Sequence, residues 1–395
     1  MPEYWYPTAF SCWGDEEKAA IERVIASGKF TMGEEVAAFE REMAAYHGRK
    51  HCIAVNSGSS ANLVAVAALG EIRRSVPKGN FWVNSHPFNF SAHMPAIAWA
   101  TTYAPFVQLC DGNAIAFVHD VDDTWNSVIP PTTFVKGSRL GAYNLVACSI
   151  LGNPAHLSDA RLYIDTMNDE QGQRLYWLLE DNAESLGART SDGRLTGTFG
   201  DISTGSGFYS HQLSATELGW ILTDDDEIAR FCRLLRNHGN DGWGSEDFDK
   251  SYNFVLFGFN VRPVEMHAAI AREQLKKLDA MIDRRRQNYE LFRGLTENLV
   301  IHPRRNGQMS PFGMHFCVSD NDTRRRLVRE FRSNDIDCRL PTGGSFRMHE
   351  YGKLWRGQQT PNADRIHQTG LFLGNAPWDI SDKIERAVNI MREIL

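Results

Sequence analysis

Short apolar runs without polar interruptions recur along this chain, and they constrain its fold more than any other feature of the sequence. A strand with one face in water alternates apolar and polar residues, whereas a continuous apolar run is typical of a strand covered on both faces. Helical patterns lie between several of the runs, so the order of elements predicts an α/β fold with a mostly parallel sheet between helices. The runs are residues 52–56, 115–119, 146–150, 176–180 and 219–223.

Three segments have the apolar periodicity of amphipathic helices. Residues 15–26 begin with acidic side chains, which suit the positive end of a helix dipole, and residues 33–46 place apolar side chains three and four positions apart. A longer helix is predicted from Pro263, which we expect in its first turn. Beyond about residue 280, Arg-rich helical patterns and short apolar runs indicate a smaller α+β unit.

Composition excludes several classes of function. The chain has 395 residues, 42 Lys+Arg against 49 Asp+Glu and no block of like charge, which argues against a nucleic-acid groove. No apolar run approaches the roughly 18–20 residues of a membrane helix, and the N-terminus lacks the order of a signal peptide, so we expect a cytoplasmic protein without a membrane partner. The seven cysteines have no zinc-site spacing, and Gly48 interrupts the only His-x-x-x-His pair, so no metal is expected.

Two segments place polar residues where a predicted strand ends. In NSGSSAN (56–62), a strand is followed by small residues and a helical pattern, and backbone N–H groups at such a helix start bind phosphate well. An ordinary Ser-capped helix is the alternative. In LLEDNAESLGA (178–188), a strand delivers Asp181 at its carboxyl end, where it could hold a protonated ring nitrogen or simply cap the next helix.

Two further segments carry single candidate residues. His211 follows a run of small residues that allows close approach to a ligand, although a lone histidine is more often structural. Trp99 ends an apolar run and offers a flat face for an aromatic cofactor, with a core tryptophan as the alternative.

Taken in chain order, these segments resemble the DegT/DnrJ-like sugar aminotransferase and dehydratase family of pyridoxal-phosphate (PLP) enzymes. The resemblance implies fold type I, the aspartate aminotransferase-like fold, with a mostly parallel seven-stranded sheet and a small C-terminal α+β domain. It divides the chain into an arm (1–12), a PLP-binding domain (13–275) and a C-terminal domain (276–395), and it implies a homodimer with a shared active site. The matching segments are FTMGEEVAAFEREMAAY, AVNSGSSANL, MPAIAWATTYAP, ILGNP, EDNAESLGA, TFGDI, SGFYSHQL, GFNVRPVEMHAAIAREQLKKLD, PNADRIH and FLGNAP.

The resemblance also implies a role for individual residues. Gly58, Ser59 and Ser206 resemble the residues that hold the cofactor phosphate, and Trp99 the residue that stacks on the pyridine ring. Asp181 resembles the partner of the ring nitrogen, which keeps the ring protonated as an electron sink. Glu184 stands where the family usually has Gln, near the ring face or its hydroxyl. Asn260 resembles a residue donated across a dimer interface to the neighbouring subunit's cofactor phosphate.

His211 departs from the majority of the family, which has a cofactor-binding lysine at this position. No lysine occurs between residues 201 and 226, so no covalent bond to the cofactor can form there. A minority branch shares the histidine: the 3-dehydratases that make 3-deoxy sugars. Similarity to that branch implies non-covalently bound pyridoxamine phosphate (PMP) or PLP, a nucleotide-linked 4-keto sugar as substrate, His211 as acid and base, and an amino donor such as L-glutamate.

Two alternatives remain open from the sequence: a keto-sugar aminotransferase and a non-catalytic sugar-nucleotide-binding regulator or scaffold. Gln212, Leu218 and Trp220 differ from the residues usual in the branch, which favours either a reshaped sugar pocket or loss of activity. A further set of arginines offers contacts to a diphosphate or a carboxylate, with solvated surface arginine as the more common explanation. They are Arg233, Arg236 and Arg339.

Overall fold

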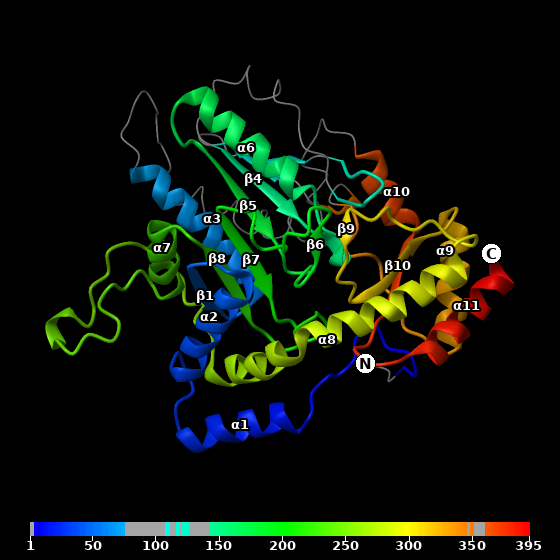
Figure 1. The fold of residues 1–395 in the computed structure, drawn as a ribbon, viewed down its shortest axis with the longest axis horizontal. Coiled ribbons are helices and arrows are strands. Elements are labelled where there is room, and N and C mark those ends of the chain that lie inside the picture. The colour runs from blue at the N-terminus through cyan, green and yellow to red at the C-terminus, as the bar shows by residue number, and fades with distance from the viewer. Residues whose placement is uncertain are drawn as a thin grey trace.

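A seven-stranded sheet lies at the centre of the computed structural model, which describes residues 4–75, 107–110, 116–118, 120–126, 143–345, 348–350 and 360–395 (Figure 1). The strand order is β1-β8-β7-β5-β4-β2-β3. Strands β2 and β8 are antiparallel to both of their neighbours, and the other strands share one direction. The bounds are β1 His51–Val55, β2 Val107–Cys110, β3 Ala116–Val118, β4 Tyr143–Cys148, β5 Tyr176–Asp181, β7 Ile202–Ser206 and β8 Gly219–Thr223.

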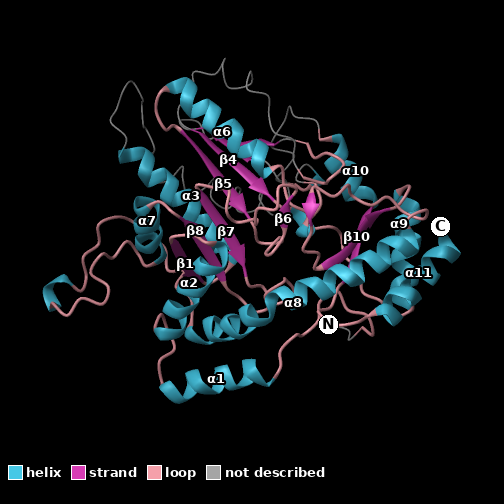
Figure 2. Ribbon diagram, viewed as in Figure 1, coloured by secondary structure: helices cyan, strands magenta, loops and turns pink. Residues whose placement is uncertain are grey.

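Every residue of β5, β7 and β8 is buried, as continuous apolar runs predict. Helices α3 (Gly58–Ser75) and α7 (Asp226–Arg236) cover one face of the sheet, where they pack on Ile53 and Ile221. Helices α2 (Glu34–His47) and α8 (Glu265–Thr296) pack on the other face against Cys52 and Leu222, and α6 (Leu157–Gln171) extends that layer over β4 and β5 (Figure 2).

The predicted helices are present with small differences at their ends. Helix α1 spans Asp15–Ser27, α2 follows the second pattern, and α8 follows the long one. The expectation for Pro263 is wrong in detail, because Val264 is extended and the helix begins at Glu265. The Glu265 carboxylate accepts hydrogen bonds from the backbone N–H groups of Gly33, Glu35 and Val36, so its side chain caps the start of α2.

A second apolar core lies in the C-terminal part of the chain. Strands β10 (Gly313–Cys317) and β11 (Gly370–Gly374) form an antiparallel pair that packs with α9 (Asn321–Ser333), α11 (Ser381–Ile394) and the C-terminal part of α8. Tyr6 is fully buried in this core, and its hydroxyl donates to the Gly374 carbonyl at 2.8 Å. The shorter elements are β6 Arg189–Thr190, β9 Gly307–Gln308, α10 Pro361–Thr369, η1 Ile150–Gly152 and η2 Phe248–Lys250.

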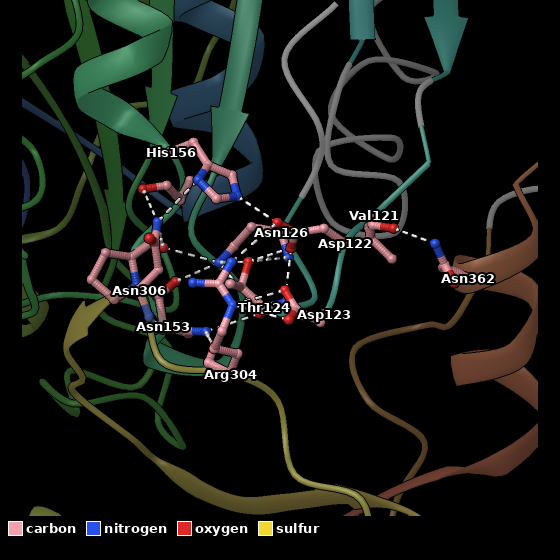
Figure 3. A network of polar contacts seen from close by, with 12 residues as sticks. Val121, Asp122, Asp123, Thr124, Asn126, Asn153, His156, Arg304, Asn306 and Asn362 are labelled. Carbon is pink, nitrogen blue, oxygen red and sulfur yellow. Dashed lines mark hydrogen bonds and ion pairs between the residues drawn. The ribbon is translucent and has the colours of Figure 1, made fainter.

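A polar network holds residues 120–126 between the sheet and the C-terminal elements (Figure 3). Asp122 pairs with His156 at 2.8 Å, and Arg304 binds Asp123 through its Nε at 2.9 and 3.0 Å. Asn153 donates to the carbonyls of Thr124 and Arg304, which joins the two sides directly. The network therefore fixes the C-terminal elements relative to the loop that follows β4.

Candidate active site

Three elements meet at one edge of the sheet and bring the predicted phosphate-binding residues together. Strands β5 and β7 are parallel neighbours, so Asp181 and Ser206 emerge at the same edge, and Gly58 begins α3 beside them. A Cβ placed on Gly58 would lie 2.7 Å from the Ser206 Cβ, so only glycine allows this approach. The Ser57 hydroxyl accepts a hydrogen bond from the Ser60 N–H at 3.1 Å. Backbone N–H groups at the start of a helix suit the binding of an anion.

A hydrogen-bonded chain fixes the Asp181 carboxylate, which is only 3% exposed. The Asn62 amide donates to Asp181 Oδ2 at 2.9 Å, and the Ala183 N–H donates to Oδ1 at 3.0 Å. The Thr204 hydroxyl in turn donates to Asn62 Oδ1 at 2.6 Å. The carboxylate is therefore held in one orientation, as a partner for a flat protonated ring requires. The sequence interpretation assigned no role to Asn62 or Thr204, although Asn62 lies one helical turn after Gly58 and so shares its face.

His211 lies in the loop that connects the antiparallel strands β7 and β8. Its backbone N–H donates to the Phe208 carbonyl at 2.9 Å, and its ring lies against the rings of Phe208 and Phe312, at centroid distances of 5.6 and 5.2 Å. The ring Nδ1 is buried without a hydrogen-bond partner in the described part of the chain. Burial lowers the pKa of His211 to about 4, so the imidazole is neutral near pH 7. A neutral ring with an unpartnered nitrogen can accept a proton.

Glu184 has its pKa shifted in the opposite direction. Burial, with a further contribution from the charge of Asp181, raises the pKa of Glu184 to about 7, although the hydrogen bond from the Leu151 N–H to Oε2 at 2.8 Å opposes the shift. Leu151 has a φ of 52°, an uncommon left-handed conformation for a non-glycine residue. Near neutral pH, Glu184 therefore exists in both protonation states and can donate as well as accept.

The three residues that depart from the sequence pattern are buried in the interior. The Gln212 amide donates to the carbonyls of Glu184 at 2.7 Å and Ser310 at 2.6 Å, which ties the His211 loop to two other segments. Leu218 and Trp220 are both fully buried, and the indole of Trp220 packs against Phe39 in the core. All three side chains are fully buried, so none of them is exposed to a ligand. The position of Trp220 therefore does not support a direct effect on the shape of the sugar pocket.

The remaining predicted residues are more dispersed. Ser59 is exposed in the first turn of α3, and Asn260 is exposed in a bridge with Asn237 that precedes α8. Trp99 lies outside the described residues. Among the three arginines, Arg236 is engaged with Glu40 and the Ala54 carbonyl, which leaves a structural role.

Among the residues that the structure describes, no group of three or more His, Cys, Asp or Glu side chains converges to hold a metal ion. His47 is buried beside the Met43 carbonyl, whereas His51 pairs with Asp226, so the two rings of the His-x-x-x-His pair have different neighbours. No helix among the described residues combines the length and apolarity needed to cross a bilayer.

The sequence matches the DegT/DnrJ/EryC1/StrS aminotransferase family over residues 11–392, and the chain belongs to this family. It is 36% identical to the GDP-4-keto-6-deoxy-D-mannose 3-dehydratase of Escherichia coli O55:H7, over 99% of each chain. The structure is similar to that of the E. coli enzyme with bound hydrated PLP, with a TM-score of 0.80, 30% identity and coverage of 99% of this chain and 100% of that one. A GDP-4-keto-6-deoxymannose 3-dehydratase with a trapped PLP–glutamate geminal diamine gives a TM-score of 0.79 at 30% identity, covering 98% of this chain and 100% of the other. The predicted fold type I architecture is confirmed.

Proposed function

We propose that this protein is a PMP/PLP-dependent 3-dehydratase that removes the C3 hydroxyl of a nucleotide-linked 4-keto sugar. The observation that carries the proposal is His211, a neutral histidine that stands at the position of the family's cofactor-binding lysine. Full-length similarity to 3-dehydratases supports the same choice over the aminotransferases of the family.

The residues at the sheet edge fit the cofactor. Gly58, Ser59 and Ser206 would hold its phosphate, since the Gly58–Ser206 approach leaves backbone and hydroxyl groups free of side-chain bulk. Asp181, oriented by Asn62, would pair with the ring nitrogen. When bound, the cofactor supplies an electron sink for bond breaking next to the sugar carbonyl. We assign ring stacking to Trp99, on its family position alone.

His211 and Glu184 divide the proton transfers. The His211 imidazole, neutral at pH 7, accepts a proton at its free ring nitrogen and returns it as the C3 hydroxyl leaves. It forms no covalent bond to the cofactor, so the cofactor is held only by non-covalent contacts. Glu184, which is protonated in part at pH 7, lies close to Asp181 and supplies a hydrogen-bond donor to the ring hydroxyl. L-Glutamate is the amino donor that we expect, in keeping with the glutamate adduct of the similar enzyme.

Replacing His211 by Asn tests the proposal. The His211→Asn variant should lose turnover of GDP-4-keto-6-deoxymannose by about 1,000-fold while it retains PMP, as measured by near-ultraviolet absorbance. The His51→Asn variant is the matched control and should keep full activity, because His51 begins β1 at the end of the strand away from Gly58. A wild-type product that is a 3-deoxy sugar with released ammonia supports the dehydratase. An amino sugar as product would establish the aminotransferase instead, and a protein that binds no cofactor would support the non-catalytic alternative.

We further propose that the active site is completed in a homodimer. Residues 237–260 form an arm that projects beside α7 and carries several aromatic side chains in water (Figure 1). Phe248 and Phe257 are 89% and 92% exposed, and Asn260 stands exposed where the arm returns to the molecule. Aromatic groups left this open are typical of an interface between copies of a chain.

The shared site can be tested with hybrid dimers. A homodimer of either variant, His211→Asn or Asn260→Ala, is defective in both of its sites, whereas a mixed dimer has one site with both changes and one site free of both. Mixing the two variants after mild dissociation should therefore restore about a quarter of wild-type activity. No recovery, with mixed dimers shown to be present, would contradict a site shared between subunits.

A cytoplasmic location completes the proposal. The cysteines whose side chains the structure describes are all free thiols, which suits a reducing compartment.

A further inference from the structure

Helix α9 carries a concentration of positive charge that the proposed reaction does not use. Its sequence, NDTRRRLVREFRS, has five arginines and two acidic residues, in a chain with a net charge of −7. The buried face of the helix consists of Leu327 and Phe331, so most of the arginines point away from the core. A local cluster of one sign on an otherwise acidic protein attracts ligands of the opposite sign.

Four of these arginines line a cavity of about 580 Å³ between α9 and residues 338–340. Arg339 and His367 add donors from two other segments, and Val328, Leu340 and Leu371 supply apolar surface. None of the described residues that line the cavity is acidic. Its volume lies within the roughly 300–1,000 Å³ that is usual for small-molecule sites. The four helix arginines are Arg324, Arg325, Arg329 and Arg332.

The arginines of the cavity are poorly neutralised by the protein itself. Arg325 and Arg339 reach their nearest carboxylates only at 3.9 and 3.7 Å, which are weak exposed contacts. Among the described residues, Arg329 and Arg332 form no ion pair. Burial, with a further contribution from the charge of Arg325, lowers the pKa of Arg324. The cluster is therefore under mutual repulsion that a bound anion would relieve.

Leu371, which lines the cavity, and Phe372, which leads toward His211, lie on opposite faces of the β10–β11 pair. Adjacent residues of a strand point to opposite faces. Leu371 lines the cavity and packs in the core with α9, whereas the ring of Phe372 contacts Phe312, which in turn contacts His211. A ligand in the cavity therefore does not occupy the proposed catalytic site.

We propose that this cavity is a second site, which binds the diphosphate group of a small soluble ester. Guanidinium groups bind phosphate oxygens through paired hydrogen bonds, and arginines from α9 and from residue 339 can contact both phosphates of a diphosphate. The apolar wall formed by Val328, Leu340 and Leu371 would cover the organic part of the ester. The inference concerns binding alone and does not depend on the dehydratase activity.

Calorimetric titration with inorganic pyrophosphate tests the site on protein saturated with PLP, which occupies the proposed phosphate cradle at Gly58. Wild-type protein should bind one pyrophosphate per chain with an affinity that falls as salt is raised. Arg329→Gln should weaken this binding about tenfold. Arg326→Gln is the matched control, because Arg326 lies on the same helix, is exposed, and does not line the cavity; its affinity should stay within about twofold of wild type.

Three results would overturn the proposal. Equal weakening by both substitutions would mean that the helix acts only through its general charge. Titration of wild type without saturable binding would mean that the cavity holds no diphosphate. Binding to phosphatidylglycerol vesicles that depends on Arg329, without binding of pyrophosphate, would assign the arginines to a lipid surface. Both variants should melt at the wild-type temperature, since the two side chains are exposed.

Discussion

At the scale of single residues, His211 and Glu184 show how one physical cause prepares two opposite chemical roles. Burial disfavours the charged form of each group. It lowers the pKa of the histidine to about 4 and raises the pKa of the glutamate to about 7. The fold therefore keeps a neutral base and a partly protonated acid at the same edge of the sheet, and neither requires a neighbouring ion of opposite charge.

Glu184→Gln tests the role of the protonated glutamate. If the neutral carboxyl is the active form, wild-type kcat/KM falls as pH rises through about 7, because Glu184 loses its proton there. The glutamine keeps a donor at every pH, so the variant should retain most of its activity and lose this decline. Profiles of kcat/KM from pH 6 to 9 measure the difference. A decline of the same size in the variant would assign the titration to another group.

Thr204→Val tests whether Asn62 orients Asp181. The change removes the hydroxyl that donates to Asn62 at 2.6 Å but keeps the shape of the side chain. Asn62 then loses the hydroxyl that fixes its Oδ1, so PLP affinity should fall several-fold with a stability loss of about 1 kcal/mol. Thr223→Val is the control, because Thr223 is also buried and donates to the Asp201 carbonyl, away from the site. A similar loss of stability without a change in PLP affinity is expected there.

The site residues that the sequence identified are those whose types recur in recognisable motifs. Gly58, Ser206, Asp181 and His211 do converge at one edge of the sheet. Their roles toward a cofactor stay predictions. Thr204 could not have been found, because its contact with Asn62 spans 142 positions and carries no local signal.

At the scale of elements, the β7–β8 connection places His211. The two strands are antiparallel, so residues 207–218 form a closed loop at the site edge, and the Gly207 and Tyr209 N–H groups donate back across it. Gln212 then anchors the loop from inside: its side-chain amide donates to two carbonyls, and its backbone carbonyl accepts from Arg285 at 3.0 Å. Gln212 thus acts as a positioning residue for His211, a use that the motif comparison did not anticipate.

Trp220 fits in the core because its indole ring packs directly on the backbone of Gly205. A Cβ on Gly205, its partner across the β7–β8 pair, would lie 2.2 Å from the indole ring. Gly205→Ala should therefore cost about 1–3 kcal/mol of stability through overpacking. Trp220→Leu alone leaves a cavity, but the double variant should be less destabilised than the sum of the two changes. Denaturant unfolding of all four proteins measures this coupling, and strict additivity would show that the two side chains do not compete for space.

The apolar runs predicted for the large sheet are confirmed as strands, and one strand that the runs missed is made largely of small and polar residues. Strand β7, Ile202–Ser206, has the sequence ISTGS and gives no apolar signal, yet all of it is buried. Glycine at 205 makes room for Trp220, and Ser206 faces the helix start at Gly58. The features that hide this strand from sequence analysis are thus those that its packing requires.

At the scale of the whole molecule, α8 connects the two apolar cores without interruption. The helix packs on α1 and α2 near its start and on α11 and β10 further along. It runs unbroken through residue 275, so the division of the chain at that point stays a prediction. Tyr6 and the Asp122–His156–Arg304 network add further links between the N-terminal and C-terminal elements.

The protein should begin to lose stability at pH values well above the usual pKa of carboxylates. The reason is that several histidines are buried in the neutral form. Burial lowers the pKa of His47 to about 4, His302 to about 4 and His315 to about 3. An unfolded histidine takes up a proton near pH 6.5, whereas these folded ones do not, so stability is lost as pH falls from about 6.5 toward 4. Glu184, with its raised pKa, acts in the opposite sense and offsets part of the loss.

His47→Asn isolates one such contribution. His47 is 5% exposed, contacts the Met43 carbonyl through Nδ1, and has no partner for Nε2 among the described residues. Between pH 7.5 and 5.5 it should account for about 1 kcal/mol of lost unfolding free energy. Guanidinium unfolding at both pH values measures this contribution: the unfolding free energy lost between pH 7.5 and 5.5 should be smaller by that amount in the variant than in wild type, whatever the absolute stability of the variant. An unchanged difference in His47→Asn would mean that His47 takes up its proton in the folded protein too.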